Sequence, residues 1–183
     1  TLPSRIKEAA KNNISLTVST LATFKRLAKL KNPPKVHIKI DTGMHRQGFF
    51  LKDLPWVIKL LKQFKLSIEG LYTHLAAAKD RLYHSYSFKQ IEDFKKADKL
   101  FKKAKLENYI RHIVASAGAI LYPEAHFDLV RIGIGLYGMF PNRELKVQTK
   151  ISLKPALTWK SIISEIKNVP KGSYIGYDLT EKI

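Results

Sequence analysis

The chain has 183 residues, a formal net charge of +18 and no cysteine. This length fits one domain or part of a larger one, and it suffices for a core without disulfides or a structural metal. The absence of cysteine excludes a disulfide framework, zinc sites built on thiolates and a cysteine nucleophile.

The positive charge is compatible with two classes of partner, nucleic acid and anionic membrane. Most lysines, however, fall on the polar faces of predicted helices, as in residues 59–65 and 95–105. A solvated lysine-rich face is the simpler interpretation. No run reaches the roughly 18 apolar residues of a membrane helix, and residues 1–11 lack the apolar centre of a signal peptide. We therefore expect a soluble, cytoplasmic protein that binds neither nucleic acid nor membrane.

The first half of the chain alternates apolar runs of strand length with segments of helical period, which predicts βα units and a parallel sheet. Strands are predicted at residues 14–19 and 35–41. A helix at residues 20–30 separates them, and the loop 42–48, which contains glycines, follows the second strand. The next helix is predicted from four apolar residues at helical spacing: Val57, Leu60, Leu61 and Phe64.

Three further strands are predicted at residues 67–74, 111–116 and 128–135. A long helix at residues 87–106 follows the first of them, with its aromatic and aliphatic residues facing inward: Phe88, Ile91, Phe94 and Phe101. A short segment, 117–122, joins the last two strands.

The alternation of strand-like and helix-like segments ends beyond Pro141. A polar linker through residue 150 leads to a β-rich stretch at 157–169 and a strand at 173–177. This pattern is typical of the opening of a second, all-β domain.

Five parallel strands cannot close a (β/α)8 barrel, which needs eight strands and about 250 residues. The alternatives are an open sheet and a partial barrel. Polar residues and glycines gather where the predicted strands end, the rim where parallel α/β folds bind ligands. We therefore predict an α/β fold with a partial (β/α)8 TIM barrel of about five βα units in residues 1–141. Residues 142–183 are predicted to form the linker and the start of the β domain.

Charged residues in the second strand make the first candidate site. Lys39 and Asp41 lie on the same side of this strand, and Arg46 follows its end. Two inward charges in an apolar strand are costly unless they are paired. The pattern allows two interpretations: a Lys39–Asp41 ion pair in the barrel interior, or an anion held by Arg46.

The later strands add weaker signals. Arg131 interrupts an apolar strand and needs a partner, for which His74 at another strand end is a candidate. Ser116 offers a hydroxyl at a strand end, and Gly133 allows close approach of backbone amides to a ligand. Tyr177, taken alone, is most simply an exposed tyrosine.

Five segments in order resemble alanine racemase, a pyridoxal-phosphate enzyme of fold type III. The segments are VHIKIDTGMHRQGF at 36–49, GLYTHLAAAKD at 70–80, VASAGA at 114–119, FDLVRIGIGLYG at 127–138 and VPKGSYIGYDLT at 169–180. The resemblance implies pyridoxal 5′-phosphate as cofactor, interconversion of L- and D-alanine for peptidoglycan, and a homodimer. It implies no metal.

The resemblance also implies roles for individual residues. Arg131 would bond to the pyridine nitrogen of the cofactor, with His74 linking it to the catalytic tyrosine. Arg46 would reach the phenolic oxygen of the cofactor and the substrate carboxylate, oriented by Lys39, which many members carry carbamylated. The phosphate would be held by Ser116 and the amides of Gly133 and Ile134.

Tyr177 matches the family's acid/base tyrosine, which acts across the dimer interface. The family's second base is the Schiff-base lysine of a V-K-A-N-A-Y-G-H-G segment, and this chain has no such segment. We therefore expect the chain to be part of a longer racemase and inactive by itself. Departures from the family pattern are Ala115 for Asn, His45 for a small residue, Leu75 for Phe and Asp178 after the tyrosine.

Three alternatives remain open from the sequence. Another amino-acid racemase of the same fold would share these segments. A non-catalytic pyridoxal-phosphate-binding homeostasis protein would be a barrel alone, which the β-rich C-terminal stretch disfavours. A basic nucleic-acid-binding module is supported only by the net charge.

Overall fold

The structure, a computed structural model, describes residues 3–183. Its centre is a four-stranded sheet in the order β1-β2-β3-β4, in which all neighbouring strands are parallel. The strands are β1 (Leu16–Val18), β2 (Val36–Lys39), β3 (Ile68–Tyr72) and β4 (Ile110–His112). The α/β class and the parallel sheet expected from the sequence are thus confirmed.

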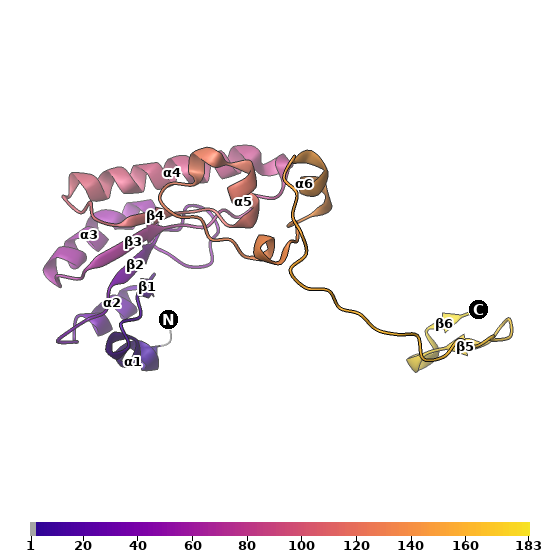
Figure 1. Ribbon diagram of the computed structural model, residues 1–183. Coiled ribbons are helices and arrows are strands. Elements are labelled where there is room, and N and C mark those ends of the chain that lie inside the picture. Colours follow the sequence, from indigo (N-terminus) through magenta and orange to yellow (C-terminus); the bar gives the residue numbers. More distant parts are fainter. Residues whose placement is uncertain (1–2) are drawn as a thin grey trace.

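Helices follow the strands in the order that the periodicity predicts. They are α1 (Ile6–Lys11), α2 (Leu21–Leu27), α3 (Leu54–Gln63), α4 (His84–Lys103), α5 (Ser116–Leu121) and α6 (Arg143–Gln148). Helices α2, α3 and α4 line one side of the sheet (Figure 1). Thr20 caps α2, its hydroxyl accepting from the amide of Thr23 at 3.3 Å. Helices α1 and α6 were not predicted from the sequence, and α5 was predicted only as a short joining segment.

The core lies between the sheet and these helices. Val36, Ile38 and Ile40 of the second strand region are fully buried with Phe24 of α2 and Phe94 of α4 in one apolar cluster. Because side chains alternate along a strand, His37, Lys39 and Asp41 project from the opposite face. Because the apolar residues of this segment pack in the core, its charged residues lie on the side of the sheet away from the helices.

The inward face of α4 differs in one residue from the prediction. Ile91, Phe94 and Phe101 are buried, as the helical spacing predicts. Phe88 is 46% exposed, so its predicted inward orientation is wrong. It lies on the rim of the core, edge-on to the ring of Tyr122 at 5.6 Å between centroids.

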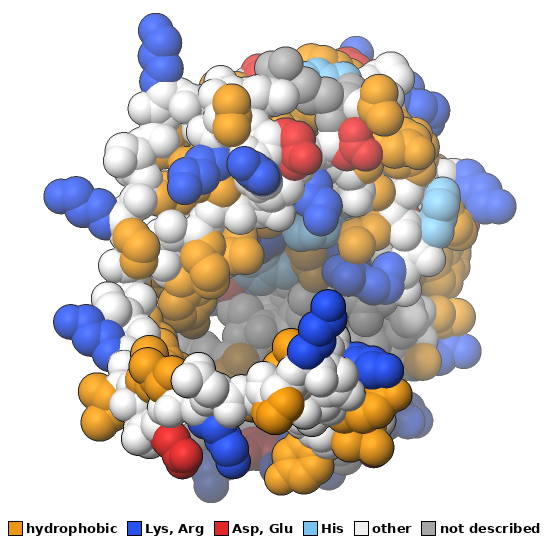
Figure 2. Space-filling model, turned by 90° about the vertical axis from the view of Figure 1, so that its right-hand side faces the viewer, with side chains coloured by type: hydrophobic (Ala, Val, Ile, Leu, Met, Phe, Trp, Pro, Cys, Tyr) orange, Lys and Arg blue, Asp and Glu red, His pale blue; other side chains and the backbone are white. Residues whose placement is uncertain are grey.

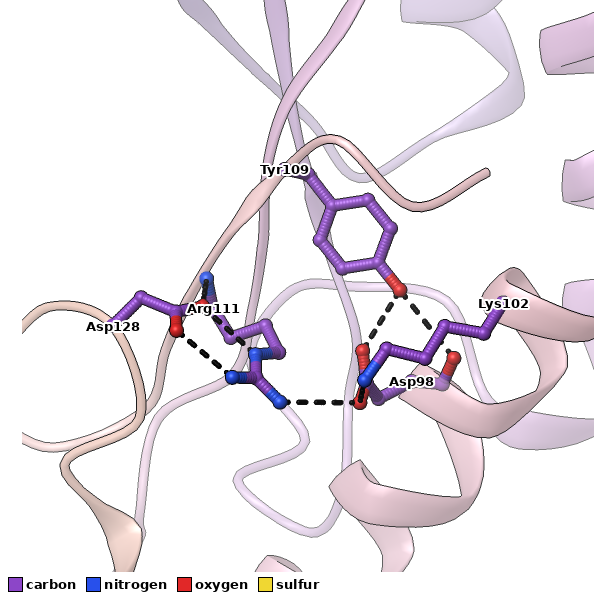
Figure 3. Close-up of polar contacts among 5 residues, drawn as sticks. All are labelled: Asp98, Lys102, Tyr109, Arg111 and Asp128. Carbon is purple, nitrogen blue, oxygen red and sulfur yellow. Dashed lines mark hydrogen bonds and ion pairs between the residues drawn. The ribbon is translucent and has the colours of Figure 1, made fainter. Parts of the chain in front are cut away.

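A network of ion pairs and hydrogen bonds joins α4 to β4 (Figure 3). The Arg111 guanidinium donates through Nε and Nη2 to both carboxylate oxygens of Asp128, each at 2.8 Å. The Asp98 carboxylate accepts from the hydroxyl of Tyr109 and from Lys102, both at 2.8 Å. Arg111 also contacts Asp98 at 3.5 Å. The network fixes the start of β4 to the C-terminal half of α4 and to the loop that leads to Arg131.

The predicted fifth strand, residues 128–135, is reduced to a single parallel bridge between Ala115 and Arg131. Residues Ile134–Tyr137 form a 3-10 helix instead. Ile132 and Ile134 are 45% and 43% exposed, so this apolar stretch has no second layer to bury it. Glycines within it further weaken extended pairing.

The chain beyond α6 also departs from the prediction. Residues 157–169, expected to be β-rich, contain neither a strand nor a helix and are almost entirely exposed. An antiparallel hairpin of β5 (Tyr174–Ile175) and β6 (Glu181–Lys182) follows, separated from the sheet by this extended stretch (Figure 1). Within residues 3–183, no helix combines the length and the apolar character that crossing a membrane requires.

Candidate active site

A cavity of about 340 Å³ lies on the face of the sheet away from the helices. It is lined by residues of all four strands, of the segments that follow β2 and β3, and by the bridge residue Arg131: Thr17, His37, Lys39, Arg46, Gln47, Tyr72, His74, His112 and Arg131. Four of the residues singled out in the sequence (Lys39, Arg46, His74 and Arg131) therefore meet in one cavity.

Arg131 is the centre of this cluster. Its Nη2 donates to Nδ1 of His74 at 3.0 Å and to the carbonyls of Thr73 at 3.0 Å and Ile113 at 3.2 Å. Its Nη1 donates to Nδ1 of His112. The sequence-based pairing of His74 with Arg131 is thus confirmed. A guanidinium with this many acceptors is held in one orientation.

Both histidines beside Arg131 are kept neutral. Burial, then the cations Arg131, Lys39 and Arg46, lower the pKa of His74 to about 4. Burial, followed by Arg131, lowers the pKa of His112 to about 3. Since Arg131 can only donate, each imidazole presents an unprotonated Nδ1 to it and carries its proton on Nε2.

Lys39 is 3% exposed, and its ammonium lies 5.0 Å from the centre of the Tyr72 ring. Burial lowers its pKa, and the neighbouring cations Arg46 and Arg131 add to this effect. Lys39 and Asp41 do not form the ion pair that was one interpretation of their spacing.

The Asp41 carboxylate instead shapes the loop after β2. Its Oδ1 accepts from the backbone amides of Gly43 and His45, each at 3.0 Å. A bridge between Ile40 and Phe49 closes the loop at its base. The loop thereby presents Arg46 at the mouth of the cavity, close enough for its charge to act on His74 and Lys39.

A second set of polar groups lies at the end of β4. The hydroxyl of Ser116 accepts from the amides of Gly133 at 3.0 Å and Gly135 at 3.2 Å. Ile134, between these glycines, is 43% exposed. The structure thus brings Ser116 to the glycine segment as the sequence predicts.

Tyr177 lies in the hairpin region, within a 3-10 helix at Tyr177–Leu179, and is 96% exposed. Within this chain the structure does not bring it to Arg131 or His74. Its neighbour Asp178 has a positive φ of 59°, a conformation that a non-glycine residue adopts mainly in turns.

Sequence reasoning missed the other five residues that line the cavity: Thr17, His37, Gln47, Tyr72 and His112. His112 stacks on Tyr72 with 4.7 Å between ring centroids. A signal was present for His37, which shares the alternating pattern of Lys39 and Asp41 in one strand. Nothing in the sequence distinguishes His112 from an ordinary strand residue.

The cluster is a set of hydrogen-bond donors and cations with few anions. Arg131, Arg46 and Lys39 face the cavity, and Ser116 at the start of α5 lies beside the glycine segment, whose Gly133 and Gly135 amides donate to its hydroxyl. In Figure 2, some histidine side chains lie recessed in the hollowed middle of the molecule, and Lys and Arg side chains lie around this hollow as well as at the periphery. Such a donor set fits a ligand with a phosphate and a neutral ring nitrogen.

Comparison with known proteins gives one consistent result. Residues 1–141 match the family described as alanine racemase, N-terminal domain. The alanine racemase of Carboxydothermus hydrogenoformans is 40% identical over 184 residues, covering 98% of this chain and 50% of that protein. That of Leptospira interrogans serovar Lai is 39% identical over 174 residues, covering 92% of this chain and 45% of the relative.

Solved structures agree with the sequence relatives. An alanine racemase from Bacillus anthracis with bound L-Ala-P superposes with a TM-score of 0.85 at 33% identity, covering 100% of this chain and 48% of that one. The alanine racemase of Clostridium difficile 630 gives 0.83 at 32% identity, covering 100% and 48%. The chain thus spans about half the length of the relatives it matches.

Proposed function

Because this chain belongs to the alanine racemase family, we propose that it carries part of the active site of a pyridoxal-phosphate racemase, an isomerase that interconverts L- and D-alanine. The observation that carries the proposal is Arg131, a cation fixed between two neutral histidines at the wall of a cavity rich in donors.

Arg131 is the proposed partner of the pyridine nitrogen. A guanidinium has donors and no acceptor, and its ordinary pKa lies so far above neutral pH that it stays protonated even though burial lowers the pKa of Arg131. It therefore offers a proton in a hydrogen bond without giving it up, and the ring nitrogen remains unprotonated. Pyridoxal phosphate supplies the electron withdrawal that makes the α-proton of an amino acid removable, and Arg131 tempers this withdrawal.

The other donors of the cluster suit the remaining groups of the cofactor and substrate. Ser116, with the backbone amides of Gly133 and Ile134, is the proposed phosphate site; the structure supports this by bringing Ser116 to the glycine segment, where the Gly133 amide donates to its hydroxyl and would turn to the phosphate when this is bound. Arg46 at the mouth is the proposed partner of the substrate carboxylate and of the phenolic oxygen. The lowered pKa of Lys39 favours the neutral amine that reacts with carbon dioxide, which supports its proposed carbamylation.

Tyr177 is the proposed acid/base group for the α-proton, acting in the site of a second subunit of a homodimer. Its 96% exposure on a hairpin outside the sheet supports a role toward another subunit. His74, whose Nε2 carries a proton, is the proposed link between this tyrosine and Arg131.

The proposal concerns the whole racemase, of which this chain contributes about half by comparison with its relatives. We place the barrel part at residues 1–141 and the linker and start of the β domain at 142–183. The end of the family match at residue 141 supports this division. In the proposed function the enzyme is cytoplasmic and supplies D-alanine for peptidoglycan. Without the family's Schiff-base lysine, the chain alone is expected to lack racemase activity.

The first test measures binding of a phosphorylated pyridine. Pyridoxine 5′-phosphate is the sharper probe, because it has no aldehyde to react with the many surface lysines. We expect Arg131→Ala to weaken its binding to the chain by about tenfold or more, the effect of losing a hydrogen bond to a charged group. Isothermal titration measures the dissociation constants.

The matched control is Arg143→Ala, which removes an exposed arginine in α6, outside the cavity. It should leave the affinity unchanged. Equal losses in both variants would indicate non-specific attraction to a basic protein and would contradict the proposed site.

A further inference from the structure

A line of hydrogen-bonded side chains runs from Arg131 across the face of the sheet that lines the cavity. It ends at Glu69, near the start of β3. Nη1 of Arg131 contacts Nδ1 of His112, and Nε2 of His112 lies 2.9 Å from Nδ1 of His37. Nε2 of His37 lies 3.3 Å from Oε2 of Glu69. Four groups on three strands and the bridge residue thus form one continuous chain of hydrogen bonds.

The two ends of this chain determine the direction of every bond. Arg131 can only donate, and an ionised Glu69 can only accept. Nδ1 of His112 must therefore accept from Arg131, so its proton is on Nε2 and is donated to His37. His37 in turn accepts at Nδ1 and donates from Nε2 to Glu69. The two imidazoles thus have the same arrangement, accepting at Nδ1 and donating from Nε2.

The backbone is built to admit this arrangement. Val36 pairs with Ile68, but the next residue, His37, pairs with Gly70, which leaves Glu69 as an extra residue in β3. Such a bulge turns a side chain to the other face of a sheet. A Cβ at Gly70 would collide with the imidazole of His37. The bulge and the glycine together bring Glu69 and His37 into contact.

Further contacts hold the two ends of the chain in place. The Glu69 carboxylate also accepts from the hydroxyl of Ser15 and from Nζ of Lys35 at 3.2 Å. The Ser15 hydrogen bond, followed by that of Lys35, lowers the pKa of Glu69, which keeps it ionised. His112 is 6% exposed and is stacked on Tyr72. The carboxylate at one end of the chain and the central ring of His112 are thus both fixed in position.

We propose that Glu69 is a positioning residue that acts through His37 and His112 to hold the guanidinium of Arg131 in its orientation. If His112 took the opposite tautomer, its Nδ1–H would face an N–H of Arg131, and the guanidinium would lose this acceptor. The inference rests on the proposed function for the group that Arg131 faces. The effect of Glu69 on the tautomer of His112 can be measured without any cofactor.

The test is nitrogen-15 NMR of the chain labelled at histidine, which distinguishes a ring nitrogen that carries hydrogen from one that does not. In the parent chain we expect hydrogen on Nε2 and none on Nδ1 for both His37 and His112. Glu69→Leu removes the final acceptor and should give His112 a mixture of tautomers. Glu69→Gln retains a carbonyl acceptor and should preserve the parent pattern.

Glu92→Leu is the matched control, since it makes the same change at an exposed site on α4, and it should preserve the tautomers. We also expect Glu69→Leu to weaken the binding of pyridoxine 5′-phosphate by about fivefold, the effect of one hydrogen bond. Glu69→Gln should stay within about twofold.

Two results would overturn the inference. One is a proton on Nδ1 of His112 in the parent chain, a result that does not depend on any variant folding. The other is an unchanged His112 tautomer in Glu69→Leu while the parent binds the probe. If instead the parent fails to bind the probe but its tautomers respond to Glu69, the proposed function fails and the positioning role of Glu69 is supported.

Discussion

Arg131 lies between His74 and His112, and all three are at least partly buried. Charging either imidazole would place a second cation beside the guanidinium in a region of low polarity. The lowered pKa values of both histidines express this cost. At the scale of single residues, the site therefore combines one permanent cation with two histidines that must remain neutral.

This requirement predicts a pH dependence of stability. In the unfolded chain both histidines titrate near pH 6.5, whereas in the fold their pKa values are about 4 and about 3. Below pH 6.5 the unfolded state therefore binds more protons, so the free energy of unfolding falls as the pH drops toward 4. Urea denaturation across this range measures the slope. His112→Gln removes one titrating group and should give a shallower slope, whereas an equal slope would contradict the assigned burial.

The pairing of His74 with Arg131 could be predicted from the sequence, because a buried arginine requires an acceptor and a strand-end histidine was available. The roles of His37, His112 and Glu69 could not. They depend on a register shift between β2 and β3, which reverses the face that Glu69 would take from simple alternation. No local sequence pattern predicts such a register shift.

At the scale of elements, the network of Figure 3 fixes β4 to α4. The hydrogen bonds from Arg111 lower the pKa of Asp128 to about 2. Because the Asp128 side chain is 38% exposed, solvent screens part of this interaction. The bidentate geometry nevertheless makes it stronger than an ordinary surface pair.

We expect Asp128→Ala to lower the free energy of unfolding by about 1 kcal/mol, an estimate reduced for solvent exposure. Urea denaturation at neutral pH measures this change. Glu8→Ala is the control, because it breaks the exposed Arg5–Glu8 pair at the start of α1, which should cost less than about 0.5 kcal/mol. Losses of equal size in both variants would show that the Asp128 pair is no more than a surface contact.

Helical period predicted α3 and α4 well, because both have a clear apolar stripe against the sheet. The fifth strand was less predictable. Its composition is that of a buried strand, but a strand forms only where neighbours cover it, and Leu129, Ile132 and Ile134 remain 40–45% exposed. Local composition could not reveal that the burying layer is absent around this segment.

At the scale of the whole molecule, local composition also could not predict the structure of residues 157–169, which were expected to be β-rich. Its apolar residues are among the most exposed of the described chain, with Trp159 at 90%, Ile162 at 92% and Ile166 at 84%. Sequence alone indicates that these residues belong in a core or an interface. It does not indicate which surface covers them.

This exposure predicts that the chain associates with itself. As an edge strand of the sheet, β1 can pair with another strand, and the apolar stretch at 157–169 adds surface that water disfavours. Sedimentation at moderate salt, which screens the net charge, should show a mass that rises with concentration. Ile162→Lys with Ile166→Lys should reduce this rise.

The control for added charge is Leu82→Lys with Val147→Lys, which changes two residues that are 87% and 78% exposed outside that stretch. It adds the same two positive charges and should leave association largely as in the parent. If both double variants reduce it equally, charge repulsion alone accounts for the effect and the stretch at 157–169 is not the contact surface. If neither does, the edge strand β1 is the remaining candidate, because strand pairing uses backbone groups that side-chain changes do not remove.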